Sequence, residues 1–248
     1  MSHRLPPPIP AIGEIILPKL PSPNSKKLRQ AIINTCLDMN ETGINQGTSG
    51  NVSARVEGGM LITPSGRPYK SMKPKDIVFM HEDGAYEGDL VPSTEWRFHL
   101  DIMNSRQDVN AIVHAHPTFC TVIAILKKSI PRLHYMVAVA GGDDIRCAPY
   151  ATFGTQELSD HAIRALKDRK ACLLAHHGMI ATGPDLDKAM WLAVEVETLA
   201  KQYYYTLQAG GPPLLTKAEI KNVAERIHSY GPRSEADEEN STKPKRAG

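Results

Sequence analysis

The 248-residue sequence lacks the marks of several large protein classes. No run approaches the roughly 18 continuous apolar residues of a membrane span, so we predict no membrane association. The net charge of +2 is too small for the basic surface typical of nucleic-acid-binding proteins. The four cysteines lie far apart with no C-x-x-C pair, a pattern typical of reduced thiols in a cytoplasmic protein. Neither the phosphate-binding loop motif G-x-x-x-x-G-K-[ST] nor the dinucleotide-binding motif G-x-G-x-x-G is present.

The two ends of the chain differ in composition from its middle. Residues 1–24 are dense in proline, which predicts an extended arm, and they lack the uninterrupted apolar run of a secretory signal. Residues 232–248 carry almost no apolar side chains, which predicts a disordered charged tail. Residues 25–231 are therefore the predicted folded domain, and their number fits a single hydrophobic core.

Apolar periodicity divides this domain into helices and strands. The predicted helices cover residues 25–43, 93–106, 118–128, 185–210 and 216–231. The predicted strands form a hairpin over 50–66 and further runs at 76–80, 85–89, 111–117 and 171–183, the last ending in a turn. Because local strand runs are mixed with helices, we predict an α/β (α+β) fold, with a central, mainly antiparallel sheet flanked by helices on both sides.

The strand predicted at 111–117 ends in the sequence HAHP. Side chains alternate along a strand, so His114 and His116 point to the same face. Both imidazoles can then reach one cation at the roughly 2.0–2.1 Å typical of zinc–nitrogen bonds. The alternative is two incidental histidines at a strand end.

A second apolar run, LLAHHGMIATG, also ends in histidines. His176 or His177 would complete a set of three protein ligands, the usual number at a catalytic zinc ion that keeps a position open. Glu95, behind two hydroxyl residues in PSTEWRFH, is the best candidate for a carboxylate partner. The alternative for Glu95 is a position in the first helical turn, behind a serine or threonine N-cap.

Three short loops are rich in glycine and hydroxyl residues. They are QGTSGNVS at 46–53, ITPSGRP at 62–68 and PST at 92–94. Each alone is typical of a turn, but together they offer backbone and side-chain donors without a nucleotide motif. This combination favours a compact phosphate monoester as ligand.

The motifs NQGTSGNVS, MLITPSG, PSTEWRFH, VHAHP, HYMVAVAGG, CAPYATFGT and LLAHHGMIATG together resemble the class II aldolase/adducin family. The resemblance covers roughly residues 27–231 and leaves out the arm and the tail. It implies a catalytic domain built as a sandwich around a largely antiparallel sheet. It also implies a cyclic homotetramer with active sites at the subunit interfaces.

The resemblance assigns roles to particular residues. The implied metal is zinc, one ion per subunit, with Glu95, His114, His116 and His177 as ligands, and Glu95 also acts as acid/base. The implied phosphate-binding positions are Gly50, Asn51, Ser65, Gly66, Ser93 and Thr94. Two tyrosines are implied at the substrate: Tyr135 in the neighbouring subunit's site and Tyr230 closing over it.

The implied activity is reversible cleavage of a ketose 1-phosphate to dihydroxyacetone phosphate and an aldehyde. L-fuculose 1-phosphate, 5-deoxyribulose 1-phosphate and 5-methylthioribulose 1-phosphate are all candidate substrates, in carbohydrate metabolism or in sugar salvage. Ser65 replaces a threonine of the family pattern and Ile227 an aromatic residue, while Phe153 keeps an apolar wall. These departures predict a reshaped aldehyde pocket.

Other activities remain as alternatives. A sugar-phosphate 4-epimerase of the same family shares the histidines but carries aspartate at the position of Glu95, and a methylthioribulose-1-phosphate dehydratase shares the fold and the zinc. An adducin-like interaction module would lack the ligand set. A lysine Schiff base could stabilise the same charge, but no lysine lies in a convincingly apolar strand.

Overall fold

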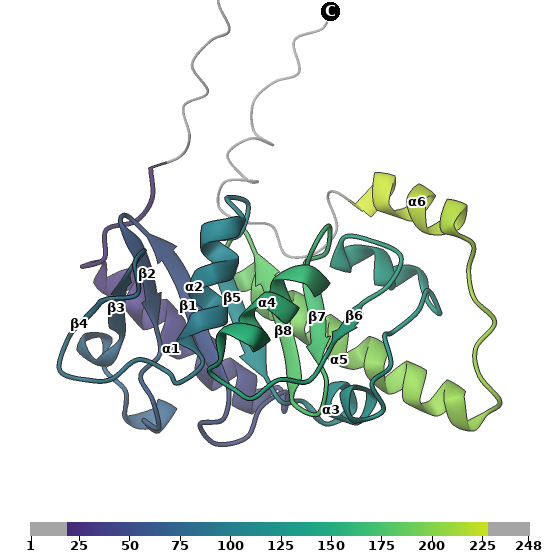
Figure 1. The fold of residues 1–248 in the computed structure, drawn as a ribbon, viewed down its shortest axis with the longest axis horizontal. Helices are drawn as coiled ribbons and strands as arrows, with labels where there is room; N and C mark the ends of the chain where they lie inside the picture. Colours follow the sequence, from purple (N-terminus) through teal and green to yellow (C-terminus); the bar gives the residue numbers. More distant parts are fainter. Residues whose placement is uncertain (1–18, 228–248) are drawn as a thin grey trace, which may run out of the picture.

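An eight-stranded sheet crosses the computed structural model, which describes residues 19–227 (Figure 1). The strands are β1 (Asn51–Val56), β2 (Gly59–Ile62), β3 (Val78–His81), β4 (Tyr86–Glu87), β5 (Ala111–Ala115), β6 (Arg146–Ala148), β7 (Ala171–Leu174) and β8 (Gly178–Gly183). Their order is β4-β3-β2-β1-β5-β8-β7-β6. Every neighbouring pair is antiparallel except β6 and β7. The predicted mainly antiparallel sheet is therefore confirmed.

Helices cover both faces of the sheet, as predicted (Figure 1). They are α1 (Lys26–Glu41), α2 (Trp96–Ser105), α3 (Thr118–Ile125), α4 (Gln156–Ala165), α5 (Leu186–Gln208) and α6 (Lys217–Arg226), with short 3-10 helices at Tyr69–Ser71, Pro74–Asp76 and Tyr135–Ala140. Helices α1, α3 and α5 pack on one face, and α2 and α4 pack on the other.

Alternation along β5 decides which face each of its side chains reaches. Ala111, Val113 and Ala115 join the core under α1, α3 and α5, whereas Ile112 joins the core under α2 and α4. His114 has the parity of Ile112, so its imidazole points toward α2. The His114 side chain therefore lies on the face of the sheet where α2 begins.

Three helix starts are capped by a side chain of the preceding residue. Ser25 accepts a hydrogen bond from the backbone of Leu28 at the start of α1. At the start of α5, Asp185 accepts one from the backbone of Lys188. Thr216 begins α6 with a capping box. Each cap satisfies backbone N–H groups that have no partner within the helix.

Several predicted elements differ in extent from the structure. The run predicted as one strand at 171–183 is two strands, β7 and β8, joined by a turn at 175–177. The strand predicted at 85–89 is only the two-residue β4. Helix α4, strand β6 and the helix at Tyr135–Ala140 were not predicted, although Thr155 is a regular N-cap for α4. The residues predicted as an N-terminal arm and a C-terminal tail lie outside the described part, apart from 19–24.

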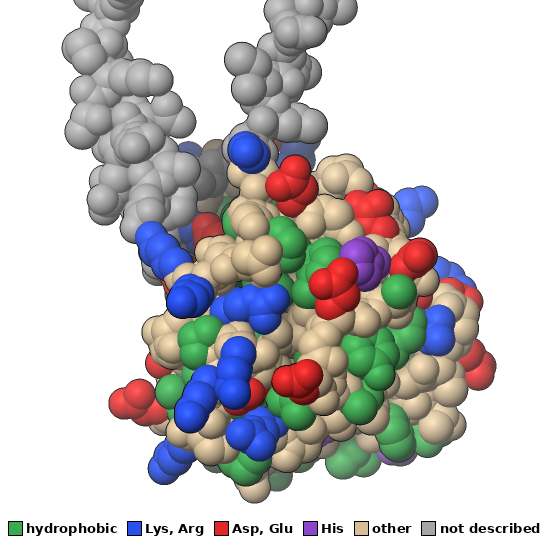
Figure 2. Space-filling view, turned by 90° about the vertical axis from the view of Figure 1, so that its left-hand side faces the viewer, with side chains coloured by type: hydrophobic (Ala, Val, Ile, Leu, Met, Phe, Trp, Pro, Cys, Tyr) green, Lys and Arg blue, Asp and Glu red, His purple; other side chains and the backbone are tan. Residues whose placement is uncertain are grey.

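The β4 edge of the sheet is short and exposed. The face that carries this edge displays scattered Lys, Arg, Asp and Glu side chains (Figure 2). Short strands and charged side chains at an edge disfavour pairing with another sheet. Among the described residues, no helix has the length and apolar character needed to cross a membrane.

Candidate metal and substrate site

Glu95, His114, His116 and His177 converge at one point, with one potential ligand atom from each within 4.8 Å of the others. They come from the residue before α2, from the end of β5 and from the turn between β7 and β8. The Nε2 atoms of His114 and His116 are 2.9 Å apart. The sequence-predicted ligand set is thus brought together in space.

The backbone around Glu95 explains why its carboxylate is available. Glu95 occupies the N-cap position of α2, but its side chain makes no capping hydrogen bond. Helix α2 begins at Trp96, three residues later than predicted, and the hydroxyl of Ser93 accepts a hydrogen bond from the Glu95 backbone. A Ser93 or Thr94 N-cap with Glu95 in the first turn is therefore not what forms. The carboxylate points to the histidines instead.

Local backbone geometry separates the adjacent histidines at 176 and 177. His176 has a left-handed φ of 56°, an uncommon conformation for a residue with a side chain. His177 Nε2 lies 3.0 Å from Oε1 of Glu95, whereas His176 contacts the ring of Tyr150. The turn thus places the His177 side chain in the cluster and the His176 side chain beside it.

His114 is oriented by the neighbouring strand. Its side chain is completely buried, and its Nδ1 lies 2.9 Å from the backbone oxygen of Met179 on β8. A carbonyl oxygen only accepts hydrogen bonds, so Nδ1 carries the proton and Nε2 presents a lone pair to the cluster. This is the usual orientation of a metal-binding histidine.

Electrostatics in the cluster favours the ligand forms of the side chains. Burial alone would raise the pKa of Glu95, but His114 and His177, when their rings are protonated, outweigh burial and hold that pKa well below its usual range. Burial and the neighbouring His114 and His177 lower the pKa of His116 to about 3. A carboxylate and a neutral imidazole are the states that bind cations.

One buried oxygen in the cluster has no hydrogen bond. Oε1 of Glu95 is within 3.0 Å of His177 Nε2, but it is unsatisfied as an acceptor. Oε2 of the same carboxylate accepts a hydrogen bond from Nδ2 of Asn51 at 3.0 Å. An unsatisfied buried carboxylate oxygen costs free energy unless a cation or a donor meets it. The cluster therefore fits a divalent metal ion with nitrogen and oxygen ligands.

An open cavity of about 360 Å³ lies over the cluster. Its lining residues are Thr94, Glu95, His116, Tyr150, Ala151, Phe153, His176 and His177. Phe153 is the wall expected from the sequence. Tyr150 and His176 were not predicted to line it, although Tyr150 lies in the quoted motif CAPYATFGT. Exposed aromatic rings beside the histidine and glutamate side chains give the cavity an apolar side.

Two of the predicted phosphate-binding loops lie side by side. Pro64 and Pro92 form a β-bridge, Ser65 donates its backbone N–H to Val91, and Ser93 donates its own to Thr63. Ser65, Gly66 and Thr94 are exposed, whereas Ser93 is buried. Gly66 has a left-handed φ of 63°, which favours glycine.

The third predicted loop approaches the same region from β1. Gly50 has no room for a side chain, because a Cβ there would lie 2.7 Å from the His114 carbonyl oxygen. Both polar groups of the buried Asn51 amide are engaged, by Glu95 and by His99. The phosphate roles of these residues stay predictions.

The two predicted tyrosines differ in what the structure describes. Tyr135 is 44% exposed, lies against the His134 ring in a tilted arrangement and does not line the cavity over its own subunit's cluster. Tyr230 lies outside the described residues. Ile227, at the end of α6, packs against the core instead of lining the cavity, and α6 itself packs on the Tyr135 helix.

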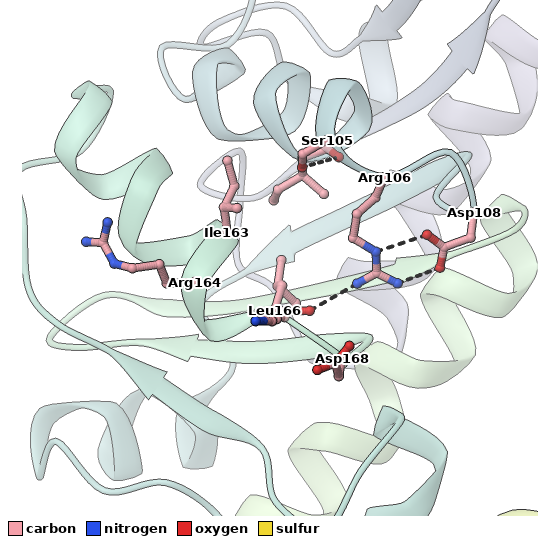
Figure 3. Close-up of a pocket in the computed structure, with 9 residues that line it drawn as sticks. Ser105, Arg106, Asp108, Ile163, Arg164, Leu166 and Asp168 are labelled. Atoms are coloured by element: carbon pink, nitrogen blue, oxygen red, sulfur yellow. Dashed lines mark hydrogen bonds and ion pairs between the residues drawn. The ribbon is translucent and has the colours of Figure 1, made fainter.

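A separate cavity of about 550 Å³ lies where α2 and α4 end (Figure 3). One of its charged groups, Arg106, is already paired with the Asp108 carboxylate and with the Leu166 carbonyl oxygen (Figure 3). None of the predicted site residues lines it. We therefore assign the chemistry to the smaller cavity.

Comparison with known proteins decides the family. Residues 30–204 match the family described as Class II Aldolase and Adducin N-terminal domain.

The chain belongs to this class II aldolase family.

Relatives within the family extend over nearly all of the described chain. L-fuculose phosphate aldolase of Escherichia coli K12 is 54% identical over 210 residues, covering 84% of this chain and 98% of the relative. The 5-methylthioribulose-1-phosphate/5-deoxyribulose-1-phosphate aldolase of Rhodospirillum rubrum is 52% identical over 204 residues, covering 82% and 92%. A solved L-fuculose 1-phosphate aldolase has a TM-score of 0.79 at 41% identity, covering 82% and 97%. This class II aldolase is therefore an enzyme of the aldehyde-lyase class.

Proposed function

We propose that the enzyme is a zinc-dependent aldolase that reversibly cleaves a ketose 1-phosphate to dihydroxyacetone phosphate and an aldehyde. The observation that carries the proposal is the cluster of three histidines and one carboxylate, with an unsatisfied Oε1 on Glu95. Three imidazoles with a carboxylate suit zinc better than magnesium or calcium, which prefer all-oxygen sites. The open cavity above the cluster leaves space for a small substrate.

Side chains of the enzyme would have the following roles in the reaction. A zinc ion held by the cluster supplies Lewis-acid stabilisation of the negative charge left on the phosphate-bearing fragment. Glu95, ionised at rest, would take up a proton from water and pass it to this fragment after the C3–C4 bond breaks. Tyr135 of a neighbouring subunit takes the proton of the C4 hydroxyl group. Three loops hold the phosphate and so determine which carbons face the metal. Their phosphate-binding residues are Gly50, Asn51, Ser65, Gly66, Ser93 and Thr94.

The aldehyde end of the substrate would lie against the apolar side of the cavity. Phe153 and Tyr150 are 62% and 58% exposed there. Exposed rings of this kind suit the methyl or methylthio end of a short aldehyde. Relatives named for L-fuculose phosphate and for 5-methylthioribulose 1-phosphate are about equally similar to this chain. We therefore propose a substrate from this group.

A coupled assay for dihydroxyacetone phosphate tests the substrate proposal. We expect release from at least one of the 1-phosphates of L-fuculose, L-rhamnulose, 5-deoxyribulose and 5-methylthioribulose, with loss of release when the C1 phosphate is omitted. If none of the four yields dihydroxyacetone phosphate, the aldolase proposal fails. Epimerised or dehydrated product in the same reactions would then identify a 4-epimerase or a dehydratase.

The position of Tyr135 supports an active site shared between subunits. The residue is half-exposed and away from its own subunit's cavity, on a helix packed against α6. We propose a homotetramer in which Tyr135 and the α6 end of one subunit complete the neighbour's site. A cytoplasmic location is part of the same proposal, since all four cysteines are free thiols.

Subunit complementation tests the shared site. Tyr135→Phe and Glu95→Gln should each be nearly inactive alone, because each removes a proton-transferring group from every site. Mixed tetramers should regain part of the activity, since some sites then combine an intact Glu95 with an intact Tyr135. The measurement is aldol cleavage after co-refolding the two variants, with separately refolded variants as the control. Absence of regained activity in verified mixed tetramers would contradict the arrangement.

A further inference from the structure

A buried chain of hydrogen bonds leads away from the cluster of candidate metal ligands, beneath α2. It runs from Glu95 to Asn51 on β1, then to His99 on α2 and finally to Ser53 on β1. The contacts are 3.0 Å from Asn51 Nδ2 to Glu95 Oε2, 2.5 Å between His99 Nε2 and Asn51 Oδ1, and 2.7 Å between His99 Nδ1 and the Ser53 hydroxyl. All four residues are at most 5% exposed. Neither the metal site nor the phosphate loops require His99.

The topology makes this chain possible. Asn51 and Ser53 share the face of β1 that is opposite to Val52 and Ala54, which lie in the core under α1. Glu95 is the N-cap of α2 and His99 lies in the first turns of the helix, and both side chains reach Asn51 on β1. The imidazole of His99 stacks on Phe98 with 4.7 Å between ring centroids. Asn51, Ser53 and Phe98 thus hold the imidazole of His99 in place.

The charge of Glu95 determines the direction of every bond in the chain. A carboxylate only accepts, so the Asn51 group that faces Glu95 must be the NH₂ group. The amide oxygen of Asn51 then faces His99, and it can only accept a proton from Nε2. Nε2 therefore carries the proton of the neutral ring, and Nδ1 accepts from the Ser53 hydroxyl. No other assignment satisfies all of these buried groups.

The surroundings keep the His99 ring neutral. Burial, together with the nearby His114, lowers the pKa of His99 to about 3, against a smaller opposite effect of Glu95. A neutral ring has one donor and one acceptor, which are the two groups that the chain needs. Among the described residues, the unsatisfied buried side-chain atoms are only Oε1 of Glu95 and the Thr121 hydroxyl.

We infer that His99 is a positioning residue, which holds the Asn51 amide so that it binds Oε2 of Glu95 and leaves Oε1 as the free ligand atom. Without His99, the Asn51 amide could rotate, and the carboxylate would lose the hydrogen bond that distinguishes its two oxygens. The inference rests on the proposed function in one respect, namely that a zinc ion binds the cluster. It adds a residue that touches neither the metal nor the substrate.

Three variants separate positioning from packing. His99→Leu keeps an apolar side chain against Phe98 but removes both hydrogen bonds, and it should lower zinc affinity or kcat by about 10–100-fold. His99→Gln places an amide N–H near the position of Nε2 and should recover most of this loss. Met103→Leu changes another buried residue of α2 that takes no part in the hydrogen-bond chain, and its zinc affinity and kcat should match those of the wild type. KM should change much less than kcat in each case.

The readouts are zinc affinity by competition with a chromogenic chelator, kcat and KM, and the circular dichroism spectrum as a check of folding. In an Asn51→Ala background, His99→Leu should cause no further loss, because His99 acts through Asn51. Nitrogen-15 NMR of labelled histidine, assigned by comparison with His99→Gln, should show the Nε2–H tautomer at His99.

Three results would overturn the inference. They are wild-type zinc affinity and kcat in folded His99→Leu, a His99→Gln variant as impaired as His99→Leu, and an Nδ1–H tautomer at His99. A wild-type protein without zinc affinity would overturn the proposed function alone. In that case the tautomer would still decide the direction of the hydrogen-bond chain.

Discussion

Replacing His114 by alanine is expected to remove both bound zinc and aldol cleavage. His114 is the most constrained of the four cluster residues, because it is completely buried and its Nδ1 is held by the Met179 carbonyl oxygen. Alanine leaves the two remaining histidines and Glu95 without the central imidazole. Lewis-acid stabilisation contributes several kcal/mol in metal enzymes, so activity should fall by at least about 10³-fold.

The measurements are metal content of the purified protein and dihydroxyacetone phosphate release. The wild type should carry about one zinc ion per subunit; a chelator should abolish its activity, and added zinc should restore it. His81→Ala is the matched control, because His81 pairs with Glu87 at the edge of the sheet, away from the cluster. Normal zinc content together with unchanged activity in His114→Ala would rule out the proposed site.

Replacing Glu95 by glutamine should leave the fold and most of the bound zinc but remove most turnover. Glutamine has the shape of glutamate, and three histidines are the usual protein ligands of a catalytic zinc ion. The amide cannot carry a proton to the substrate fragment, and positioned acid/base groups contribute about 10²–10⁴-fold. A loss of kcat in this range is expected, with zinc content close to that of the wild type.

A partly buried carboxylate elsewhere on the molecule gives the control for this substitution. Glu195 on α5 is partly buried, and burial raises its pKa, but it lies outside the cluster. Glu195→Gln should keep wild-type kcat. Retained turnover in Glu95→Gln, measured on folded and metal-loaded protein, would remove Glu95 from the proposed mechanism.

The metal ligands were the part of the site most accessible from the sequence. Strand alternation alone places His114 and His116 on one face, and the resemblance selects His177 over His176. Glu95 was ambiguous, since a carboxylate behind two hydroxyl residues is equally typical of a capped helix. The ambiguity disappears only when α2 is seen to start at Trp96 without a side-chain cap.

The hydrogen-bond chain through His99 could not be predicted from local patterns. His99 has the spacing of a buried helix residue, and Asn51 and Ser53 belong to a loop and strand assigned to phosphate binding. Their contact joins positions 46 and 48 residues apart in the chain. Cavity-lining Tyr150 was overlooked for the same reason, because an exposed tyrosine in a loop carries no periodic signal.

The sequence by itself determined the family, the alternation that places two histidines on one face, and the mainly antiparallel sheet between two layers of helices. These features depend on local spacing and on long motifs, which are fixed along the chain. The tertiary structure alone decided that the Glu95 carboxylate turns to the histidines, that one of its oxygens stays unsatisfied, and that His99 holds Asn51 against the other. Those outcomes depend on which donors and acceptors meet in a buried space, and only the packing of α2 on β1 and β5 brings them together.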